Sequence, residues 1–446
     1  MEVLVKIGQL LLSLSILVVL HEMGHFLPAK WFKTKVEKFY LFFDFAPFNS
    51  LWKIQKGETE YGIGWLPLGG YVKIAGMVDE SMDTEALKKE PQPWEFRSKP
   101  AWQRLIIMIG GVTVNFLLGI LIFGMMKWHW GEPYIPNSEL KYGSQMDSVL
   151  LREGLQNGDI VTQVGNRKFD RLDPVGFIEE VALNNARTVT VLRDGQPQTV
   201  NLSEGIAEKL TSGVASKKLL MLPRTPFEVD ETQPGSPAAK ANLQKGDRIV
   251  GVNGAATPFY ADFAQAANQN KGKPVTLSVL RGADTLKVDL TLEAKGTVGV
   301  RRVLDKFYKT EREKVSLAAA IPAGYHESVD FLNTQIKAFG QMFAGKIKVQ
   351  DNLGSLISIG NMFPSTWDWE SFWGLTASLS IILAFMNLLP IPALDGGYVV
   401  FLIWEVITRR RVSDAFMEKA VTAGFFLLLG LMIFAFGLDI WRNFIR

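Results

Sequence analysis

The residues best suited to chemistry stand together in the run His21-Glu22-Met23-Gly24-His25. On a helix, residues four apart lie on one face, so both imidazoles could bind one metal ion. Glu22 lies beside them and could accept a proton from a water on that metal. The run falls in an apolar segment, Ile7–Ala29, in which Glu22 is the single charge. Because an ionisable residue in a membrane span indicates a functional site, we prefer metal binding to the alternative that the polar side chains merely reach toward the helix end.

A catalytic zinc usually has three protein ligands and one open position, so a third ligand is needed. Asp395 is the best candidate, in the segment Asn387-Leu-Leu-Pro390-Ile-Pro392-Ala-Leu-Asp395. The two prolines break a helix there, and broken backbone at membrane depth is tolerated where it is buried in protein or lines a wet cavity. Asp395 could instead cap a helix that begins at Gly396. Metal ligation is favoured because both motifs place polar groups near the same face of the membrane.

Composition restricts the chemistry further. The 446 residues include four histidines and no cysteine, which excludes a thiol nucleophile, an iron–sulfur cluster, a Cys-bound zinc and a disulfide framework. The net charge of +3 is too balanced to indicate nucleic-acid binding. Hydrophobic residues make up 48% of the chain and charged residues 21%, which indicates strongly apolar segments mixed with ordinary soluble ones. At about 150 residues per domain, two to four domains are expected.

Four stretches are apolar enough to span a bilayer, which takes about 20 residues. They are Ile7–Ala29, Leu105–Met126, Ser371–Leu394 and Ala420–Leu438. A cleavable signal peptide is the alternative for the first stretch. However, the residues before the apolar run carry little positive charge, and Phe26-Leu-Pro-Ala29 is a poor cleavage site.

The orientation of the spans follows from Lys and Arg in the short loops. Segment 30–104 holds twelve of them, and 395–419 adds a second basic group. Both segments are therefore expected in the cytoplasm, with the termini and 127–370 outside. Tryptophans at the outer ends of the spans fit an aromatic belt: Trp128, Trp130, Trp367, Trp369, Trp373 and Trp441.

The segment between the second and third spans contains a duplication. Leu155-Gln-Asn-Gly-Asp159 recurs 88 residues later as Leu243-Gln-Lys-Gly-Asp247. Each copy is followed by a short apolar strand and a tight turn, a hairpin signal. We predict two modules, 127–215 and 216–304; chance recurrence of a common turn is the alternative. The second copy, from Pro234 onward, resembles bacterial PDZ domains, which bind extended peptides or C-termini by adding a strand.

Two further segments have a recognisable periodicity. In 305–370, apolar residues at helical spacing predict an amphipathic helix, which could lie at the membrane interface or pack on the PDZ modules. The alternation of Tyr61, Ile63 and Trp65 before Pro67-Leu-Gly-Gly70 predicts a β-hairpin over 61–73. Its exposed edge could hold an unwound substrate as an added strand, or the hairpin could only pack against the first span.

In this order, the two polar motifs and the PDZ modules between them resemble the site-2 protease family of intramembrane zinc metalloproteases. The match covers nearly the whole chain and is closest to the bacterial regulator-of-sigma-E protease group. The resemblance implies His21, His25 and Asp395 as zinc ligands and Glu22 as general base. It also implies substrate binding by a set of further residues: Asn387, Pro390, Pro392, and Gly69, Gly70, Tyr71 and Val72 of the family's membrane-associated β-loop. This sequence differs from many members of the family at Phe42-Phe-Asp-Phe-Ala-Pro47, where those members have a glycine-rich stretch.

The predicted fold is a multi-pass α-helical membrane protein with four transmembrane helices, a membrane-associated β-hairpin and two inserted periplasmic PDZ domains of the α+β class. The expected division places helices at 1–29, 105–126, 371–395 and 420–441, cytoplasmic loops at 30–104 and 396–419, PDZ domains at 127–215 and 216–304, and an amphipathic region at 305–370.

The expected activity is zinc-dependent hydrolysis of peptide bonds within transmembrane segments, in the bacterial inner membrane and near its cytoplasmic face. The resemblance implies a pre-trimmed anti-sigma factor as substrate, signal-peptide remnants as further substrates, and a role in stress response. Expected partners are these substrates, peptide or C-terminal ligands of the PDZ domains, and membrane lipids, with no nucleic acid. The alternatives are an anchored protease of soluble proteins and a non-catalytic PDZ-bearing membrane scaffold.

Overall fold

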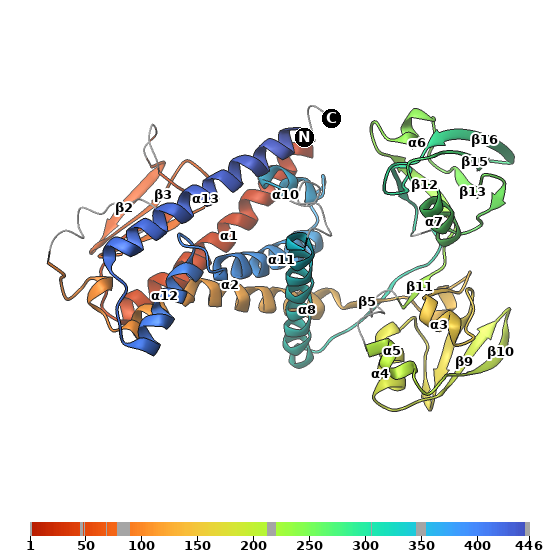
Figure 1. The fold of residues 1–446 in the computed structure, drawn as a ribbon, viewed down its shortest axis with the longest axis horizontal. Helices are drawn as coiled ribbons and strands as arrows, with labels where there is room; N and C mark the ends of the chain where they lie inside the picture. Colours follow the sequence, from red (N-terminus) through yellow and green to blue (C-terminus); the bar gives the residue numbers. More distant parts are fainter. Residues whose placement is uncertain are drawn as a thin grey trace. The chain divides into compact units, whose positions relative to one another are not determined.

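The computed structural model describes residues 2–44, 48, 50–67, 69–77, 90–211, 220–304, 306–344 and 354–441. The chain forms two compact units, a helical unit of Met1–Gly131 with Lys314–Arg446 and a β-rich unit of Glu132–Glu313 (Figure 1). Part of the segment Phe42–Pro47, in which the sequence departs from the family, lies outside the described residues.

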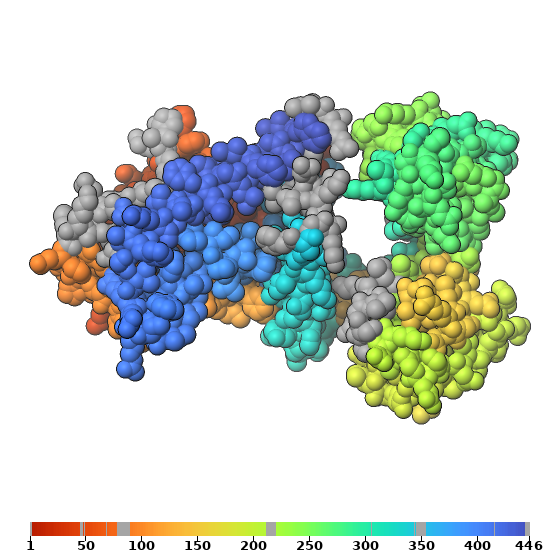
Figure 2. All heavy atoms as spheres, viewed as in Figure 1, coloured from red at the N-terminus to blue at the C-terminus, as the bar shows by residue number. Residues whose placement is uncertain are grey.

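In the described part of the chain, four helices are long and apolar enough to span a membrane, which confirms the predicted number of candidate spans. They are α1 (Glu2–Trp31), α2 (Ala101–Trp130), α11 (Trp369–Leu388) and α13 (Asp414–Ile440). In the space-filling view α13 lies on the outside of the helical unit, and beyond Lys419 its exposed side chains are mostly apolar, with Phe426 and Ile433 more than half exposed (Figure 2). An apolar exterior of this kind fits contact with lipid.

The third span is shorter than predicted. Helix α11 ends at Leu388, so the predictions of a continuous span to Leu394 and of a helix over 371–395 are wrong. Leu389 is extended (φ −60°, ψ 143°) because the ring of Pro390 disfavours helical backbone in the residue before it. The segment 396–419, predicted to be a loop, contains helix α12 (Asp395–Thr408), which exposes apolar side chains, among them Trp404 and Ile407.

Helix α2 is the central element of the helical unit and packs against α1, α8 (Leu317–Phe343), α11 and α12 (Figure 1). At its crossing with α1, a Cβ on Gly110 would lie 1.9 Å from the carbonyl oxygen of Gly24. Only glycine permits this close approach of two backbones, the arrangement typical of helix pairs in membranes. The α8 helix crosses α2 at a second glycine contact, between Gly324 and Gly124. The predicted amphipathic helix thus has a packing partner that neither interpretation considered.

A four-stranded sheet follows α1, in the order β2-β3-β1-β4. Its strands are β1 (Val36–Leu41), β2 (Trp52–Lys56), β3 (Thr59–Ile63) and β4 (Tyr71–Ile74). The predicted hairpin over 61–73 is wrong, because β1 lies between β3 and β4 and the true hairpin is β2–β3. The central position suits β1 because Val36 and Tyr40 are fully buried, and Gly62 leaves the space that the Tyr40 ring occupies.

Several short elements complete the helical unit and the ends of the β-rich unit. In the helical unit these are a 3₁₀ turn at Phe96–Ser98 and α10 (Leu356–Met362). In the β-rich unit, β5 (Glu132–Tyr134) pairs with β18 (Glu311–Glu313), and β6 (Ser144–Met146) pairs with β11 (Met221–Pro223). A 3₁₀ turn at Asn137–Glu139 follows β5.

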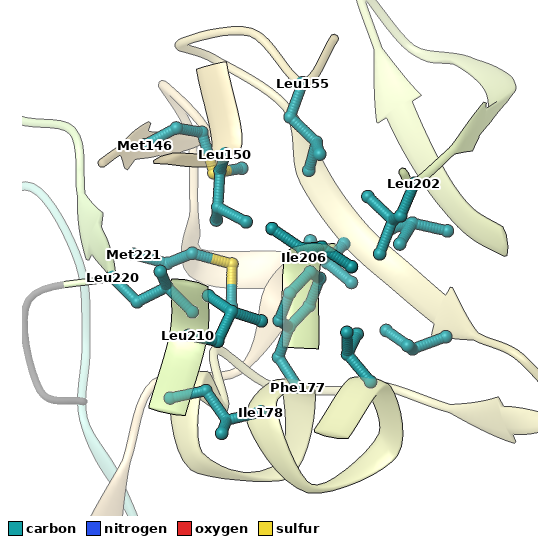
Figure 3. Packing of buried hydrophobic residues seen from close by; sticks show 14 of the residues in the cluster. Met146, Leu150, Leu155, Phe177, Ile178, Leu202, Ile206, Leu210, Leu220 and Met221 are labelled. Carbon is teal, nitrogen blue, oxygen red and sulfur yellow. The ribbon is translucent and has the colours of Figure 1, made fainter. Parts of the chain in front are cut away.

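The first half of the β-rich unit has the strand order β10-β9-β7-β8. Its elements are α3 (Ser148–Arg152), β7 (Ile160–Val164), β8 (Arg167–Lys168), α4 (Pro174–Ala182), β9 (Thr188–Arg193), β10 (Gln196–Asn201) and α5 (Ile206–Thr211). The side chains of Leu150, Phe177 and Ile206 turn toward a common centre and are fully buried (Figure 3). This half therefore has a hydrophobic core of its own.

The second half has its own core and the strand order β16-β15-β13-β12-β17, with β14 paired to β13. Its elements are β12 (Phe227–Thr232), α6 (Pro237–Lys240), β13 (Arg248–Val252), β14 (Ala255–Ala256), α7 (Tyr260–Gln269), β15 (Pro274–Arg281), β16 (Asp284–Thr291) and β17 (Val300–Arg302). The path β16-β15-β13-β14 has the same order as β10-β9-β7-β8 in the first half.

The two halves also contain the same ion pair, in which a buried aspartate meets a partly exposed arginine. The Arg193 guanidinium donates two hydrogen bonds of 2.8 Å to Asp159, and Arg281 donates two of 2.7 Å to Asp247. Both carboxylates are 1% exposed. Burial by itself raises the pKa of Asp247, but hydrogen bonds from Arg281 and from the Gln244 N–H outweigh it and hold the pKa below its usual value. In each half the pair ties the loop after the first short helix to the third strand that follows it, β9 or β15.

Candidate metal centre

Three side chains from opposite ends of the chain meet at one point. Helix α1 carries His21 and His25 one turn apart, and Asp395 is the first residue of α12. The two His Nε2 atoms are 3.3 Å apart, and each lies 3.3 Å from Asp395 Oδ2. These three atoms therefore form a nearly equilateral triangle, and the residues are close enough to hold one metal ion.

The triangle matches the spacing that zinc requires. With zinc bonds of about 2.0–2.1 Å, adjacent corners of a tetrahedron are about 3.3 Å apart. His25 Nδ1 lies 2.8 Å from the carbonyl oxygen of Ile107, which can only accept, so Nδ1 carries a proton and Nε2 carries the lone pair of the neutral imidazole. Asp395 Oδ2 is buried and has no well-formed hydrogen bond in the described part of the chain. Lone pairs facing one another in this way fit a bound cation.

The chain segment before Asp395 is a tight, strained turn. Ala393 has φ 81°, which is unfavourable for a residue with a Cβ, and such strain clusters at functional sites. Gly396 is required next, since a Cβ there would lie 2.2 Å from the Leu389 carbonyl oxygen. The N-cap of α12 is Leu394, and no side chain caps the helix. The alternative that Asp395 caps this helix is therefore wrong, and its carboxylate faces the histidines.

Helix α12 is held against α2 by an ion pair that sequence analysis missed. Arg104 Nη2 donates to Glu405 Oε1 at 2.5 Å, and Arg104 is only 5% exposed. Arg104 Nε also donates to the Lys99 carbonyl oxygen at 2.9 Å, so the guanidinium is fixed from two sides. The apolar residues Tyr398 and Leu402 of α12 join the buried cluster beside it. These contacts position the helix that begins with Asp395.

A cavity of about 560 Å³ opens beside the three side chains. Its lining includes most of the residues predicted to act on substrate: Glu22, Gly69, Gly70, Tyr71, Val72 and Asn387. Asn387 Nδ2 lies 3.3 Å from His21 Nε2, so its amide reaches the edge of the candidate metal position. Pro390 and Pro392 shape the turn before Asp395 but are not among the described lining residues. Sequence analysis missed the β1 residue Lys38 and the α10 residues Leu356 and Ile359, which also line the cavity.

Glu22 lies where a base is needed. It lines the cavity next to both histidines and Asp395, and the main-chain N–H of Val72 donates a hydrogen bond to its carboxylate. Strand β4 thus orients Glu22 through its backbone rather than through a side chain. The arrangement combines a metal position, a carboxylate base and an amide donor around one cavity, which are the parts required for metal-assisted hydrolysis.

Helix α2 packs directly against both imidazole rings at Gly111. A Cβ on this residue would lie 2.3 Å from His25 Nε2 and 2.6 Å from His21 Cε1. Sequence analysis missed this glycine, because the contact is between helices and leaves no local pattern.

Gly111→Ala is expected to push both rings off their positions and weaken zinc binding about 10–100-fold, the range found when groups supporting metal ligands are lost. Gly119→Ala on the same helix is the matched control, because its Cβ meets chiefly the flexible end of Ile381. Competition for zinc against a chelator, with purified protein, measures both. Equal affinity in the two variants would show that Gly111 has no part in seating the histidines.

Comparison with known proteins gives a consistent picture. The sequence profile of peptidase family M50 matches residues 9–431. Protease RseP of Yersinia pestis is 29% identical over the whole of both chains, and the regulator of sigma-E protease RseP of Escherichia coli is 28% identical over 99% of this chain and 98% of its own. A Neisseria meningitidis protein classed by name among the zinc metalloproteases is 28% identical over 96% of this chain and 97% of its own. The chain therefore belongs to peptidase family M50 and is a zinc metalloprotease of the site-2 type.

Proposed function

We propose that this protein cleaves peptide bonds inside membrane-spanning segments, with His21, His25 and Asp395 as zinc ligands and Glu22 as general base. The observation that carries the proposal is the 3.3 Å triangle of Nε2, Nε2 and Oδ2 atoms, placed within a unit of four candidate spans. An anchored protease of soluble proteins would have no need of a metal position on a spanning helix, which favours membrane substrates.

Each group around the cavity has a chemical role in this proposal. A zinc ion held by the three ligands would supply Lewis-acid activation of water and of the scissile carbonyl. Glu22 takes a proton from the attacking water and returns it to the leaving amine nitrogen. The Val72 N–H keeps the Glu22 carboxylate oriented for both transfers. The Asn387 amide donates to the oxygen on which negative charge develops.

We further propose that strand β4 binds the substrate in extended form. A peptide bond in a helix is shielded by side chains and by its own hydrogen bonds, so the helix must unwind before attack. Strand β4 is the last strand in the order β2-β3-β1-β4, and no strand of the described residues pairs with its other edge. Residues 69–74 line the cavity, so a strand added at this edge lies beside Glu22. These observations support the role of the sheet in binding substrate, rather than the alternative that it only packs against α1.

The β-rich unit is proposed to contain two PDZ domains, 127–215 and 216–304, that lie in the periplasm and select substrates. The shared strand order and the Asp–Arg pairs at positions 88 residues apart support a duplicated module. Relatives are named regulators of sigma-E protease, which favours a trimmed anti-sigma factor as substrate, with signal-peptide remnants as further substrates. The basic loops favour an active site near the cytoplasmic face of the inner membrane.

Glu22→Gln is expected to reduce cleavage of a transmembrane substrate about 10²–10⁴-fold while zinc stays bound, because only the base is lost. Asp395→Ala is expected to lower zinc content together with activity. Glu2→Gln, the same exchange at the exposed start of α1, is the control and should change neither quantity. Metal analysis and cleavage assays on purified protein measure both; full activity in Glu22→Gln removes this residue from the mechanism.

Strand addition predicts a period of two along the substrate. The protein has no cysteine, so the substitution Tyr71→Cys introduces a single thiol. In an inactive Glu22→Gln background, this thiol can form disulfides with cysteines placed one at a time along a substrate span. Disulfide yield should peak at every second substrate position, as in a strand. A cysteine at exposed Trp102 is the control and should give no such pattern. Peaks three to four positions apart would mean that the substrate stays helical at this edge.

Removal of the β-rich unit tests substrate selection. Glu132 and Glu313 are partners in the β5–β18 pair, so the ends of this unit are adjacent and 132–313 can be excised with a short Gly-Ser link. The shortened protein is expected to bind zinc and to cleave substrates whose outer domains are untrimmed. The full chain is expected not to cleave those substrates. If it binds zinc but cuts no transmembrane peptide, the unit is part of the catalytic apparatus and selection is not its role.

A further inference from the structure

Helix α2 contributes no candidate ligand, yet one face of it contacts both metal-binding imidazoles. The carbonyl oxygen of Ile107 faces His25 Nδ1 at 2.8 Å, and Asn115 Nδ2 faces His21 Nδ1 at 3.2 Å. Gly111 lies between them and contacts both rings. Residues 107, 111 and 115 are spaced four apart and so form one stripe on the helix. This stripe runs opposite the His21–His25 pair of α1.

The orientation of the Asn115 amide decides whether a donor or an acceptor faces His21 Nδ1. Asn115 is fully buried, and its Oδ1 has no hydrogen-bond partner in the described part of the chain. His21 Nε2 points to the metal position, so a metal-binding His21 must carry its proton on Nδ1. Nδ1–H and the Asn115 NH₂ would then be two donors facing each other. A half-turn of the amide, which leaves its shape unchanged, places Oδ1 opposite Nδ1–H.

From this geometry we infer that Asn115 is a positioning residue for zinc, accepting the Nδ1–H of His21 through Oδ1. The role rests on the proposed ligand function of His21. It gives both histidines the same support, a proton on Nδ1 donated to α2 and a lone pair on Nε2 for the metal. Such partners fix the tautomer and the ring orientation of a ligating histidine. Ser380 Oγ donates to the Asn115 main-chain oxygen at 2.7 Å, which ties this turn of α2 to α11.

A different role is possible for a buried asparagine in a spanning helix, that of a hydrogen bond holding helices together. The two roles differ in what the residue must provide. A helix contact depends on any polar pair, whereas His21 needs an acceptor at one atom. The substitution Asn115→Asp keeps an acceptor and the size of the side chain. The substitution Asn115→Leu keeps the size and removes the acceptor.

The test compares Asn115→Leu, Asn115→Asp and the unchanged full-length protein in detergent. Zinc affinity is measured by competition with a chelator, and folding by the thermal unfolding midpoint of the metal-free protein. Asn115→Leu should bind zinc about 10–100-fold more weakly, and Asn115→Asp should bind it at least as tightly as the unchanged protein. Thr376→Val is the control, because it removes a buried hydrogen bond between α11 and Ser13 of α1 away from the histidines. Its zinc affinity should not change.

Two results would overturn the inference. One is a folded Asn115→Leu protein with unchanged zinc affinity, and the other is an Asn115→Asp protein that binds zinc as weakly as the Leu variant. If Asn115→Leu does not fold, Asn115→Ala replaces it, since small residues are tolerated where helices meet in membranes. The zinc content of Glu22→Gln, which keeps all three ligands and Asn115, separates the outcomes. If that protein binds no zinc and Asp395→Ala leaves zinc content unchanged, the ligand set itself is wrong, whatever Asn115 does.

Discussion

Three unshared electron pairs, on two imidazole nitrogens and one carboxylate oxygen, meet inside a helical membrane unit. Gathering them requires a proton or a metal ion to neutralise them, because each is taken out of water and faces the others. The rest of the helical unit holds the three groups together. Glycines let α1 approach α2, a strained turn directs Asp395 back toward α1, and the Arg104–Glu405 pair holds α12 in place. A metal ion bound by the proposed ligands would neutralise them, and it would therefore stabilise the fold as well as the site.

Strand β4 connects the fold to the chemistry. One edge of the strand is paired with β1, and the Val72 N–H of the same strand donates to Glu22. The proposed base is therefore oriented by the strand that is also proposed to bind substrate. An extended peptide added there would meet the base and the metal position without any large movement of the sheet.

Local signals predicted much of the site, and non-local contacts account for what was missed. The spacing of His21 and His25 is a property of one helix, so sequence alone was sufficient to pair them. The end of α11 at Leu388 also follows from a local rule, the effect of Pro390 on the residue before it, although the span was predicted to run further. The position of β1 between β3 and β4 depends on which strands pair, which alternation does not reveal. Asn115 is an amide in an uncharged span, and that contrast was the available signal.

The candidate ligands lie far apart along the chain. His21 and Asp395 are separated by 374 positions, although their ligand atoms are 3.3 Å apart. Because synthesis proceeds from the N-terminus, the histidine pair enters the membrane long before its carboxylate partner exists. A growing chain therefore holds at most an incomplete metal position until more than four-fifths of the protein has been made. Proteolytic capacity thus arises late in biosynthesis, when the β-rich unit has already emerged ahead of the last ligand.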